Sequence, residues 1–511
     1  MGEISPSMLE KVVVQEGGRK KPYLVFAEES LRSLTGKTSI PLGGTTRTAM
    51  SIITEIWMKP SAEWKAKELI LVSNRPLRQQ LGLDSSRKLF SWNTLSASEE
   101  LGKLLAEGAE LRRRDPRTRL SGMQKEASDV GLRMSYFESL INGDSYRVIP
   151  PTEGSDWLPF DNSGHSSVFD SLKEAWNRGE QGAFNHASTD LIALQKALSL
   201  QPPTWRISLE ILYQKAHPFL WAWILYATAG IILLVSRTSW ETFGYRLAWV
   251  LSGGGFILQA SGLLSRVLIA GRPPVTNMYE SVIWVAFGTI LFALIFESIY
   301  RAGSFLLGAI PVAVASLILA DSQPMILDRS IHPLTPVLRD NFWLTTHVLS
   351  ITLSYAAFAL ALGVAHVALS QVIAGNKPSE IISTYLYKTL QAGVLLLATG
   401  TILGGVWANY SWGRFWDWDP KETWALIALL GYLFLLHGRI SGLWGGFGLA
   451  VGSIIAFMSV LMAWYGVNFV LGAGLHSYGF GTGGFPLVAA FITLEILFLG
   501  VAIFRKRTLN Y

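Results

Sequence analysis

Long apolar runs fill the chain from residue 217 onward. Nine of them approach or exceed the about 20 residues that a helix needs to cross a bilayer. They lie near 218–236, 246–270, 281–300, 303–320, 343–372, 384–406, 423–438, 443–465 and 485–504. The pattern predicts an α-helical polytopic membrane protein with about nine spans, of which the fifth is long enough to tilt or to project from the membrane.

The first 216 residues show a different pattern. Residues 66–74 are typical of a strand, whereas 95–114 and 120–142 carry apolar residues at helical spacing. We therefore expect a soluble α+β domain over residues 1–216 and a membrane domain over 217–511. His165 and His186 lie in polar sequence that predicts loops, and no catalytic constellation accompanies them. The first domain is accordingly expected to face a partner.

The distribution of charge supports this division. Of the 43 Lys/Arg and 37 Asp/Glu residues, 54 lie within the first 216 positions. The net charge of +6 comes without a basic stripe, so no nucleic-acid partner is expected. The chain contains 0 cysteines, which excludes a disulfide, a thiolate metal site and a thiol nucleophile within it.

The loop charges predict an orientation, because Lys and Arg concentrate on the cytoplasmic side. The basic side holds the C-terminal Arg505, Lys506 and Arg507 together with Arg237, Arg301, Lys377, Lys388 and Arg439. The opposite side holds Asp321, Asp328, Asp340, Asp417, Asp419 and Glu422. This places the N-terminal domain outside the cell inner (plasma) membrane. Residues 1–40 lack an apolar signal core, so we expect a further membrane segment upstream.

The predicted loop between the sixth and seventh spans, residues 405–424, is dense in aromatic residues. Its tryptophans are Trp407, Trp412, Trp416, Trp418 and Trp424, and Arg414, Asp417, Asp419, Lys421 and Glu422 lie among them. Trp also anchors proteins at bilayer interfaces, so a plain interface belt is one interpretation. The interleaved charges favour the other, a platform for a flat conjugated ligand whose acidic substituents meet Arg and Lys.

Two histidines are predicted on the same outer side as this loop. His347 opens the fifth span, and His476 precedes the ninth. Neutral imidazoles are axial ligands of haem iron, so two of them beside an aromatic shelf would make a bis-His haem site. The alternative is a hydrogen bond across helices. His437 and His366 lie towards the inner side, where ionisable groups within spans are usually functional.

Residues 407–424 closely resemble the tryptophan-rich "WWD" segment of the haem-handling proteins of cytochrome c maturation. Three further stretches resemble the CcsA family of the CcsBA system. These are Gly271–Ser281, the segment from His347 to Ala356, and the segment from Gly466 to Tyr478. The resemblance covers roughly 245–505. The first domain more weakly resembles the outer domain of fused CcsB–CcsA chains.

This resemblance implies roles for individual residues. His347 and His476 would be the outer axial ligands of haem b, with the Trp-rich loop between them. His437 would be an intramembrane ligand that takes haem from the cytoplasmic side, paired with a histidine of a CcsB-type membrane subunit on a separate polypeptide. Arg414, Lys421 and Arg272 are candidates for the haem propionates. Asp417, Asp419 and Glu422 would fold the loop or tune the histidines.

The resemblance also implies a function in cytochrome c biogenesis. Haem would be delivered to the outer face and attached by thioether bonds to the Cys-x-x-Cys-His motif of apocytochrome c. This holocytochrome c synthase (haem lyase) activity would need the CcsB-type partner and a thiol-reducing, thioredoxin-like protein. Two alternatives are a haem exporter or chaperone of the CcmC/CcmF kind and a b-type electron-transfer membrane subunit. A purely structural scaffold would leave the aromatic loop unexplained.

Overall fold

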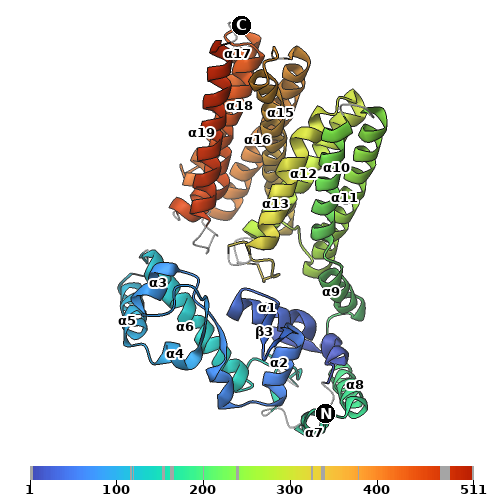
Figure 1. Ribbon diagram of the computed structural model, residues 1–511, viewed down its shortest axis with the longest axis vertical. Helices are drawn as coiled ribbons and strands as arrows, with labels where there is room; N and C mark the ends of the chain where they lie inside the picture. The colour runs from blue at the N-terminus through green and yellow to red at the C-terminus, as the bar shows by residue number, and fades with distance from the viewer. Residues whose placement is uncertain are drawn as a thin grey trace. The chain divides into compact units, whose positions relative to one another are not determined.

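The computed structural model describes residues 4–115, 118, 120–151, 156–160, 166–198, 201–236, 241–323, 326–334, 340–377, 379–471 and 484–508. The chain divides into two compact units, Met1–Lys215 and Ala216–Tyr511 (Figure 1).

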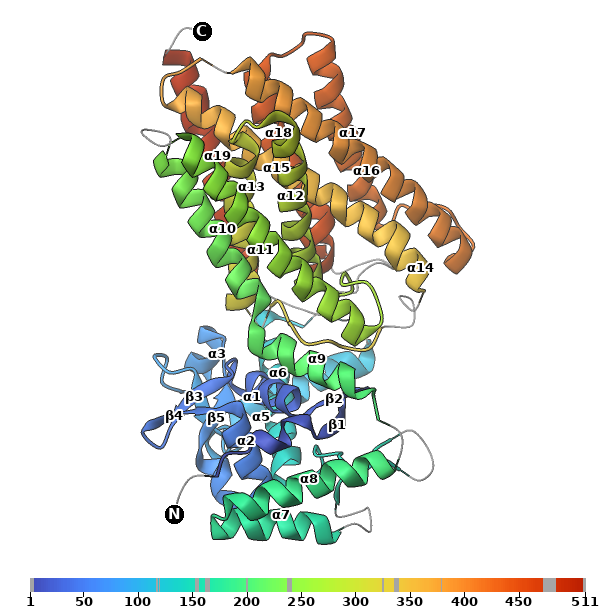
Figure 2. The same cartoon turned by 90° about the vertical axis from the view of Figure 1, so that its right-hand side faces the viewer.

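The N-terminal unit is mostly helical and contains only small sheets (Figure 2). Three two-stranded antiparallel sheets pair β1 (Val13–Glu16) with β2 (Arg19–Pro22), β3 (Ser39–Leu42) with β4 (Thr45–Thr48), and β5 (Glu68–Leu71) with β6 (Leu89–Ser91). The helices are η1 (Ser7–Lys11), α1 (Tyr23–Thr35), α2 (Ala49–Met58), η2 (Ala62–Ala66), α3 (Arg75–Gln80), α4 (Trp92–Ser96), α5 (Glu99–Arg114), α6 (Gly122–Ile141), α7 (Ser166–Arg178), α8 (Gln181–Ala197) and α9 (Thr204–Ala216).

Local sequence explains the elements of this unit that were predicted. Ser98 caps α5, and a capping box of Ser121 and Gln124 begins α6, so the free N–H groups of both helix starts are bonded. The predicted strand and the two predicted helices are confirmed by β5, α5 and α6. The loop expected around His186 is wrong, because this residue lies on α8 and pairs with Asp190 one turn later at 2.9 Å. His165 lies outside the described residues.

The second unit confirms a polytopic membrane protein. Nine helical segments of the described chain are long and apolar enough to span a membrane. Their elements are α10 (Pro218–Val235), α11 (Glu241–Ala270), α12 (Met278–Tyr300), α13 (Ser304–Ser322), α15 (Leu349–Ile373), α16 (Glu380–Trp412), α17 (Pro420–Ile440), α18 (Gly446–Leu461) and α19 (Phe485–Thr508). A short helix α14 (Asn341–Trp343) and the π-helix η6 (Leu344–Val348) precede α15, and the π-helix η7 (Met462–Leu471) extends α18.

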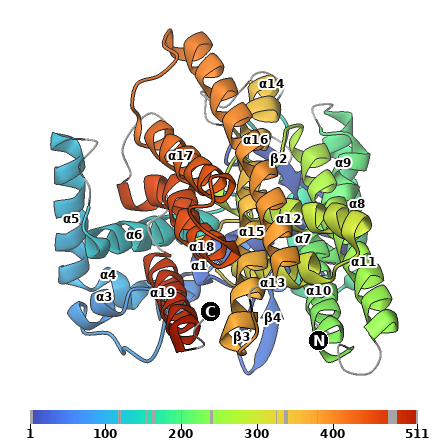
Figure 3. The same cartoon turned by 90° about the horizontal axis from the view of Figure 1, so that it is seen from above.

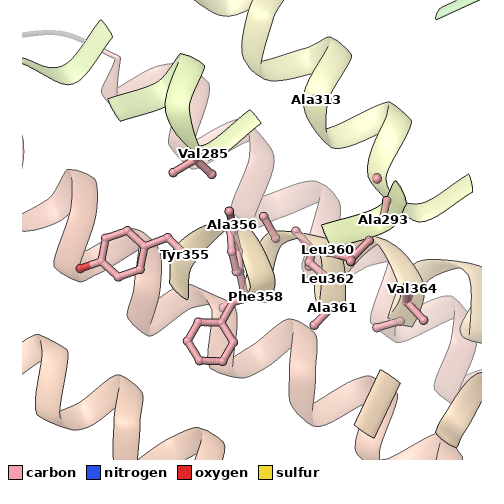
Figure 4. Packing of buried hydrophobic residues seen from close by; sticks show 14 of the residues in the cluster. Val285, Ala293, Ala313, Tyr355, Ala356, Phe358, Leu360, Ala361, Leu362 and Val364 are labelled. Atoms are coloured by element: carbon pink, nitrogen blue, oxygen red, sulfur yellow. The ribbon is translucent and has the colours of Figure 1, made fainter. Parts of the chain in front are cut away.

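Helix α15 is the centre of the membrane unit. It packs against α12, α13, α16, α18 and α19, and it is the most buried of the nine segments (Figure 3). Tyr355, Ala356, Phe358 and Leu360 belong to this core (Figure 4). The ring of Phe358 stacks on Tyr432 of α17, with centroids 3.7 Å apart. Because five helices pack against α15, its position within the membrane unit is fixed.

Helix α16 extends further than the sequence predicted. The sixth span was expected to end near residue 406, yet α16 continues to Trp412 and closes at Gly413, whose φ of 69° suits a glycine C-cap. Residues 405–412 are therefore helical, and the true loop before α17 is 413–419. Gly404 and Gly405 allow close side-chain packing on the surface of this helix.

The crossing of α13 and α15 depends on two glycines. A Cβ added to Gly363 would lie 2.1 Å from the carbonyl oxygen of Gly308. Small residues at such crossings let the backbones of membrane helices approach closely.

We expect Gly363→Ala to lower the free energy of unfolding by about 3 kcal/mol, because backbone atoms cannot rotate away from the new methyl group. Thermal unfolding in detergent measures this loss. Gly253→Ala on α11 is the matched control, since nothing lies within 4 Å of its added Cβ. Equal stability of the two variants would contradict the close crossing.

Candidate functional site

A cavity of about 180 Å³ lies within the membrane unit. Its wall is formed by the start of α12, by η6 and the first turns of α15, by α16, by residues 415–425 and by η7. Apolar and aromatic side chains dominate the wall. The lining residues with polar or aromatic side chains include Thr276, Asn277, Ser281, His347, Tyr355, Trp407, Phe415, Trp416, Lys421, Glu422, Trp464, Asn468 and Phe469. Such a cavity suits a largely apolar, conjugated ligand with a few polar groups.

Both π-helical segments of the described chain line this cavity. η6 carries His347, whereas η7 carries Trp464, Asn468 and Phe469. A π-helical turn adds a residue to the helix and redirects the side chains around it, and such turns occur frequently at functional sites. Their meeting at one cavity marks it as the candidate site.

The imidazole of His347 is held against α16. Its Nδ1 lies 2.8 Å from the carbonyl oxygen of Gly400 and donates a hydrogen bond to it. The proton is thereby held on Nδ1, and the lone pair of the neutral ring is on Nε2, the atom that would ligate a metal. Gly404 makes the approach possible, because a Cβ there would lie 2.6 Å from Cε1 of the ring.

The structure brings two of the five predicted tryptophans to the cavity. Trp407 is buried on α16 with its ring centroid 5.7 Å from that of His347, and Trp416 follows in the loop. Trp418 is 69% exposed and packs edge-on against Trp416 at 5.9 Å. Its φ of 57° is an outlier for a bulky residue, and such strain clusters at functional sites. Trp412 and Trp424 are not among the described lining residues.

Hydrogen bonds and an ion pair of the acidic residues Asp417, Asp419 and Glu422 fix the conformation of the loop before α17. Asp419 caps α17 by accepting from Lys421 N at 2.9 Å, and Glu422 accepts from the backbone N–H groups of Asp417 at 2.8 Å and Asp419 at 3.3 Å. Arg414 pairs with the carboxylate of Asp417 at 2.9 Å. Lys421 is the only Lys or Arg among the described residues that line the cavity. A positive charge therefore faces the ligand space from the start of α17.

Residues 275–281 form another part of the wall, and a buried ion pair fixes them. Glu280 contacts Arg266 of α11 at 2.7 Å, with both side chains at most 2% exposed. The second oxygen of Glu280 accepts from the backbone N of Thr276 at 2.9 Å and from its hydroxyl at 2.6 Å. The indole N–H of Trp464 donates to Ser281 at 2.9 Å, which joins this wall to η7.

Arg272 lies outside the lining residues. Its guanidinium is buried and donates to the hydroxyl of Thr276 and to the carbonyl oxygen of His332. Arg272 thereby holds the loop that contains His332. Within this loop, Nε2 of His332 lies 2.7 Å from a carboxylate oxygen of Asp328. Burial opposes ionisation of Asp328, but hydrogen bonds from the His332 ring and the Ser330 backbone N–H outweigh it and lower the pKa of the carboxyl to about 2.

The other predicted histidines are not brought to this cavity. His437 is exposed on α17, its Nδ1 donates to the carbonyl oxygen of Leu433 at 2.8 Å, and fifteen residues separate it from Glu422, which is about 22 Å along a helix. His366 lies towards the same end of the unit, with Nε2 3.0 Å from Glu495 of α19 and Nδ1 2.9 Å from the carbonyl oxygen of Leu362. His476 lies outside the described residues.

Sequence reasoning missed part of the wall. Trp464 was not predicted, and Asn468, which lies in the 466–478 segment that resembles CcsA, was given no role. Both line the cavity, and the Oδ1 of Asn468 is a buried acceptor without a hydrogen-bond partner in the described chain. It also missed the glycine face of α16. The signal was present as the four-residue spacing of Gly400 and Gly404, which puts both on one side of a helix.

Comparison with known proteins places the chain in a class. Residues 275–476 match the family model described as "Cytochrome C assembly protein". A CcsA cytochrome c biogenesis protein of Prochlorococcus marinus subsp. pastoris is 36% identical over 50% of this chain and 90% of its own length. A CcsA of Guillardia theta is 34% identical over 42% of this chain and 79% of its own. The NrfI protein of Wolinella succinogenes is 29% identical over 94% of this chain, which spans 55% of that relative.

The chain is thus a polytopic membrane protein of cytochrome c assembly. It belongs to the CcsA-type cytochrome c biogenesis family, and its function lies in cytochrome c biogenesis. The cavity wall at 275–281, the η6 histidine and the lining tryptophans Trp407, Trp416 and Trp464 all fall within the matched region.

Glu280→Gln is expected to lower the free energy of unfolding by about 3–5 kcal/mol, because it leaves the buried Arg266 guanidinium without a counter-charge. Thermal unfolding in detergent measures the change. Glu380→Gln is the matched control, since its pair with Arg439 at 2.8 Å is solvent-exposed on the Glu side and contributes less than about 1 kcal/mol. Similar losses in both variants would be incompatible with a buried pair that holds the wall.

Proposed function

We propose that this protein binds haem b in the cavity, with Nε2 of His347 as one axial ligand, and delivers it for attachment to apocytochrome c. The observation that carries the proposal is the His347 imidazole, fixed by Gly400 at the wall of an aromatic cavity. A neutral imidazole with its Nδ1–H bonded to a carbonyl oxygen is the usual state of a metal-ligating histidine.

The rest of the cavity supports haem as the substrate. Trp407, Trp416, Phe415 and Trp464 offer the flat apolar surfaces that a porphyrin face requires. The Lys421 ammonium is suited to a propionate, and among the three proposed propionate partners it alone lines the cavity, whereas Arg414 pairs with Asp417 and Arg272 with Thr276 and His332. Trp412, Trp418, Trp424, Asp417 and Asp419 then act by shaping the rim.

The second axial ligand in this proposal is His476. It follows η7 by five residues, and η7 supplies Trp464, Asn468 and Phe469 to the cavity. An apocytochrome would present the histidine of its Cys-x-x-Cys-His motif to replace one of the two ligands. The cavity thereby acts as a holder that presents one face of the iron to the acceptor.

The attachment step needs no redox co-reactant beyond reduced acceptor thiols. Each thiol S–H adds across one vinyl C=C bond of the haem, with sulfur bonded to one carbon and hydrogen to the other. The protein's part is orientation and ligand control, since the reacting groups belong to the haem and the acceptor. A thioredoxin-like protein would keep the acceptor thiols reduced, because this chain has 0 cysteines.

A second, inner haem position is part of the proposal. The exposed imidazole of His437 has its Nδ1–H bonded to Leu433, so Nε2 carries the lone pair, as in His347. A CcsB-type membrane subunit would supply the opposing histidine. His366 is a weaker candidate, because Glu495 and Leu362 occupy both of its ring nitrogens. The basic C-terminus supports an inner-membrane location with the cavity and N-terminal unit outside.

Removal of the proposed ligand should change the visible spectrum. We expect His347→Ala to lower the haem content of the purified protein at least about tenfold at the outer position and to abolish its sharp bis-His bands in the reduced state. Gly404→Ala keeps the imidazole but displaces it, so it should weaken the same bands. Gly431→Ala, whose Cβ meets nothing within 4 Å, is the control. Unchanged spectra in both His347→Ala and Gly404→Ala would exclude the outer assignment.

Covalent attachment tests the function itself. Expressed with a CcsB-type partner in a host without its own maturation system, the protein should yield acceptor cytochrome that keeps haem on a denaturing gel. His347→Ala should reduce this product, whereas His186→Ala on exposed α8 should not. Haem bound by the protein without any covalent product would instead support an exporter or chaperone of the CcmC/CcmF kind.

A further inference from the structure

Helix α9 connects the N-terminal unit to the first transmembrane helix, and one of its faces is packed. Ile207 and Ile211 are buried against Val13, Leu24 and Trp157. Glu210 on the same side is 4% exposed and pairs with Arg19 at 2.7 Å. These contacts make α9 an integral part of the N-terminal unit.

The opposite face of α9 is apolar and exposed. At 100° per residue, Trp205, Leu209, Leu212 and Ala216 fall within about 60° of arc, centred opposite the buried residues. Trp205 is 52% exposed and Leu212 is 63% exposed. No polar side chain interrupts this stripe, which we call the α9 outer face.

Basic residues flank the α9 outer face on both sides. Arg206 lies on one flank with its guanidinium 5.7 Å from the ring centroid of Trp205. Lys215 lies on the other flank and contacts Glu10 at 2.7 Å. An apolar stripe with a tryptophan and flanking Arg and Lys is the pattern of a helix that lies in the membrane interface, because the long cationic side chains reach the headgroups.

The length of the first apolar segment gives an independent argument. Thr204–Val235 comprises 32 residues, whereas a span needs about 20, so about 12 residues exceed the hydrocarbon core. That excess is close to the 13 residues of α9. His217, with a left-handed φ of 45°, and Pro218 at the first turn of α10 separate the two helices. α9 therefore ends within two residues, or about 8 Å, of the membrane-spanning α10.

We propose that the α9 outer face is a membrane-binding surface, which inserts Trp205, Leu209 and Leu212 at the boundary between lipid headgroups and acyl chains. The occupant is the lipid interface because α9 leads within two residues into the membrane-spanning α10 and because indole favours that depth. The N-terminal unit is thereby held at the bilayer through α9, and this role is separate from the cavity and its ligand.

The absence of cysteine from the chain allows single nitroxide labels in the full-length protein. We would label Ser208→Cys and Ala216→Cys, both on the outer half of α9, in vesicles of phosphatidylcholine and phosphatidylglycerol. Collision with oxygen and with a water-soluble nickel complex measures depth. Lys103→Cys on α5, whose side chain is 67% exposed, is the aqueous reference.

A helix that lies in the interface places the two labels at depths within about 5 Å of each other, both more oxygen-accessible than the Lys103 label. A helix along the membrane normal would separate them by about 12 Å, since the two positions are eight residues apart. That separation, or water exposure equal to the reference, would overturn the proposal. So would shielding from both reagents, because it indicates a protein covering the face.

A second variant tests the apolar anchors directly. Trp205→Ser with Leu212→Ser should shift the Ser208 label towards water without lowering the unfolding temperature, because both side chains are exposed. Leu132→Ser on α6, where the leucine is 66% exposed, is the matched control and should leave the label unmoved. An unchanged label depth in the double variant would also overturn the proposal.

Discussion

The hydrogen bond from His347 to the Gly400 carbonyl oxygen is the contact on which the candidate site depends. It holds one ring nitrogen and leaves the lone pair on the other. It requires helix α16 to approach η6 without side chains between them, and Gly400 and Gly404 provide this surface. Glycine weakens a helix through its conformational entropy, but in a membrane it permits close helix packing that larger residues prevent. The same residues thus stabilise the packing and position the imidazole.

A buried ion pair between α11 and α12 shapes one wall of the candidate site. Arg266 and Glu280 are buried together; Nη1 of Arg266 donates to the carbonyl oxygen of Arg329, and Glu280 accepts from the hydroxyl of Thr276. Such a pair contributes little net stability, because desolvation offsets the Coulomb attraction. Its effect is geometric, since Glu280 holds the backbone of Thr276 at the cavity wall. In the membrane unit, this ion pair therefore shapes the wall of the site, while the packing of α15 against its neighbours forms the core of the unit.

Much of the fold followed from the pattern of apolar residues. The nine spans were predictable because a bilayer demands about 20 apolar residues per helix, and the amphipathic helices α5 and α6 followed from the spacing of their apolar residues. Helix α16 was misjudged at its end, because the apolar run stops near residue 406 whereas the helix continues to Trp412. His186 was misjudged because polar residues around it predict a loop unless the buried face of α8 is known.

The sequence by itself determined the membrane class, the aromatic and histidine residues of the candidate site and the likeness to CcsA proteins, because apolar length and residue type are local properties. Only the tertiary structure decided which of them meet. Trp407 and Trp416 line the cavity with His347, whereas Arg272 and Arg414 pair elsewhere and Lys421 faces the ligand space. Trp464 and Ser281 join from helices far apart in the chain. Such neighbours depend on helix crossing and π-helical turns, which no local pattern specifies.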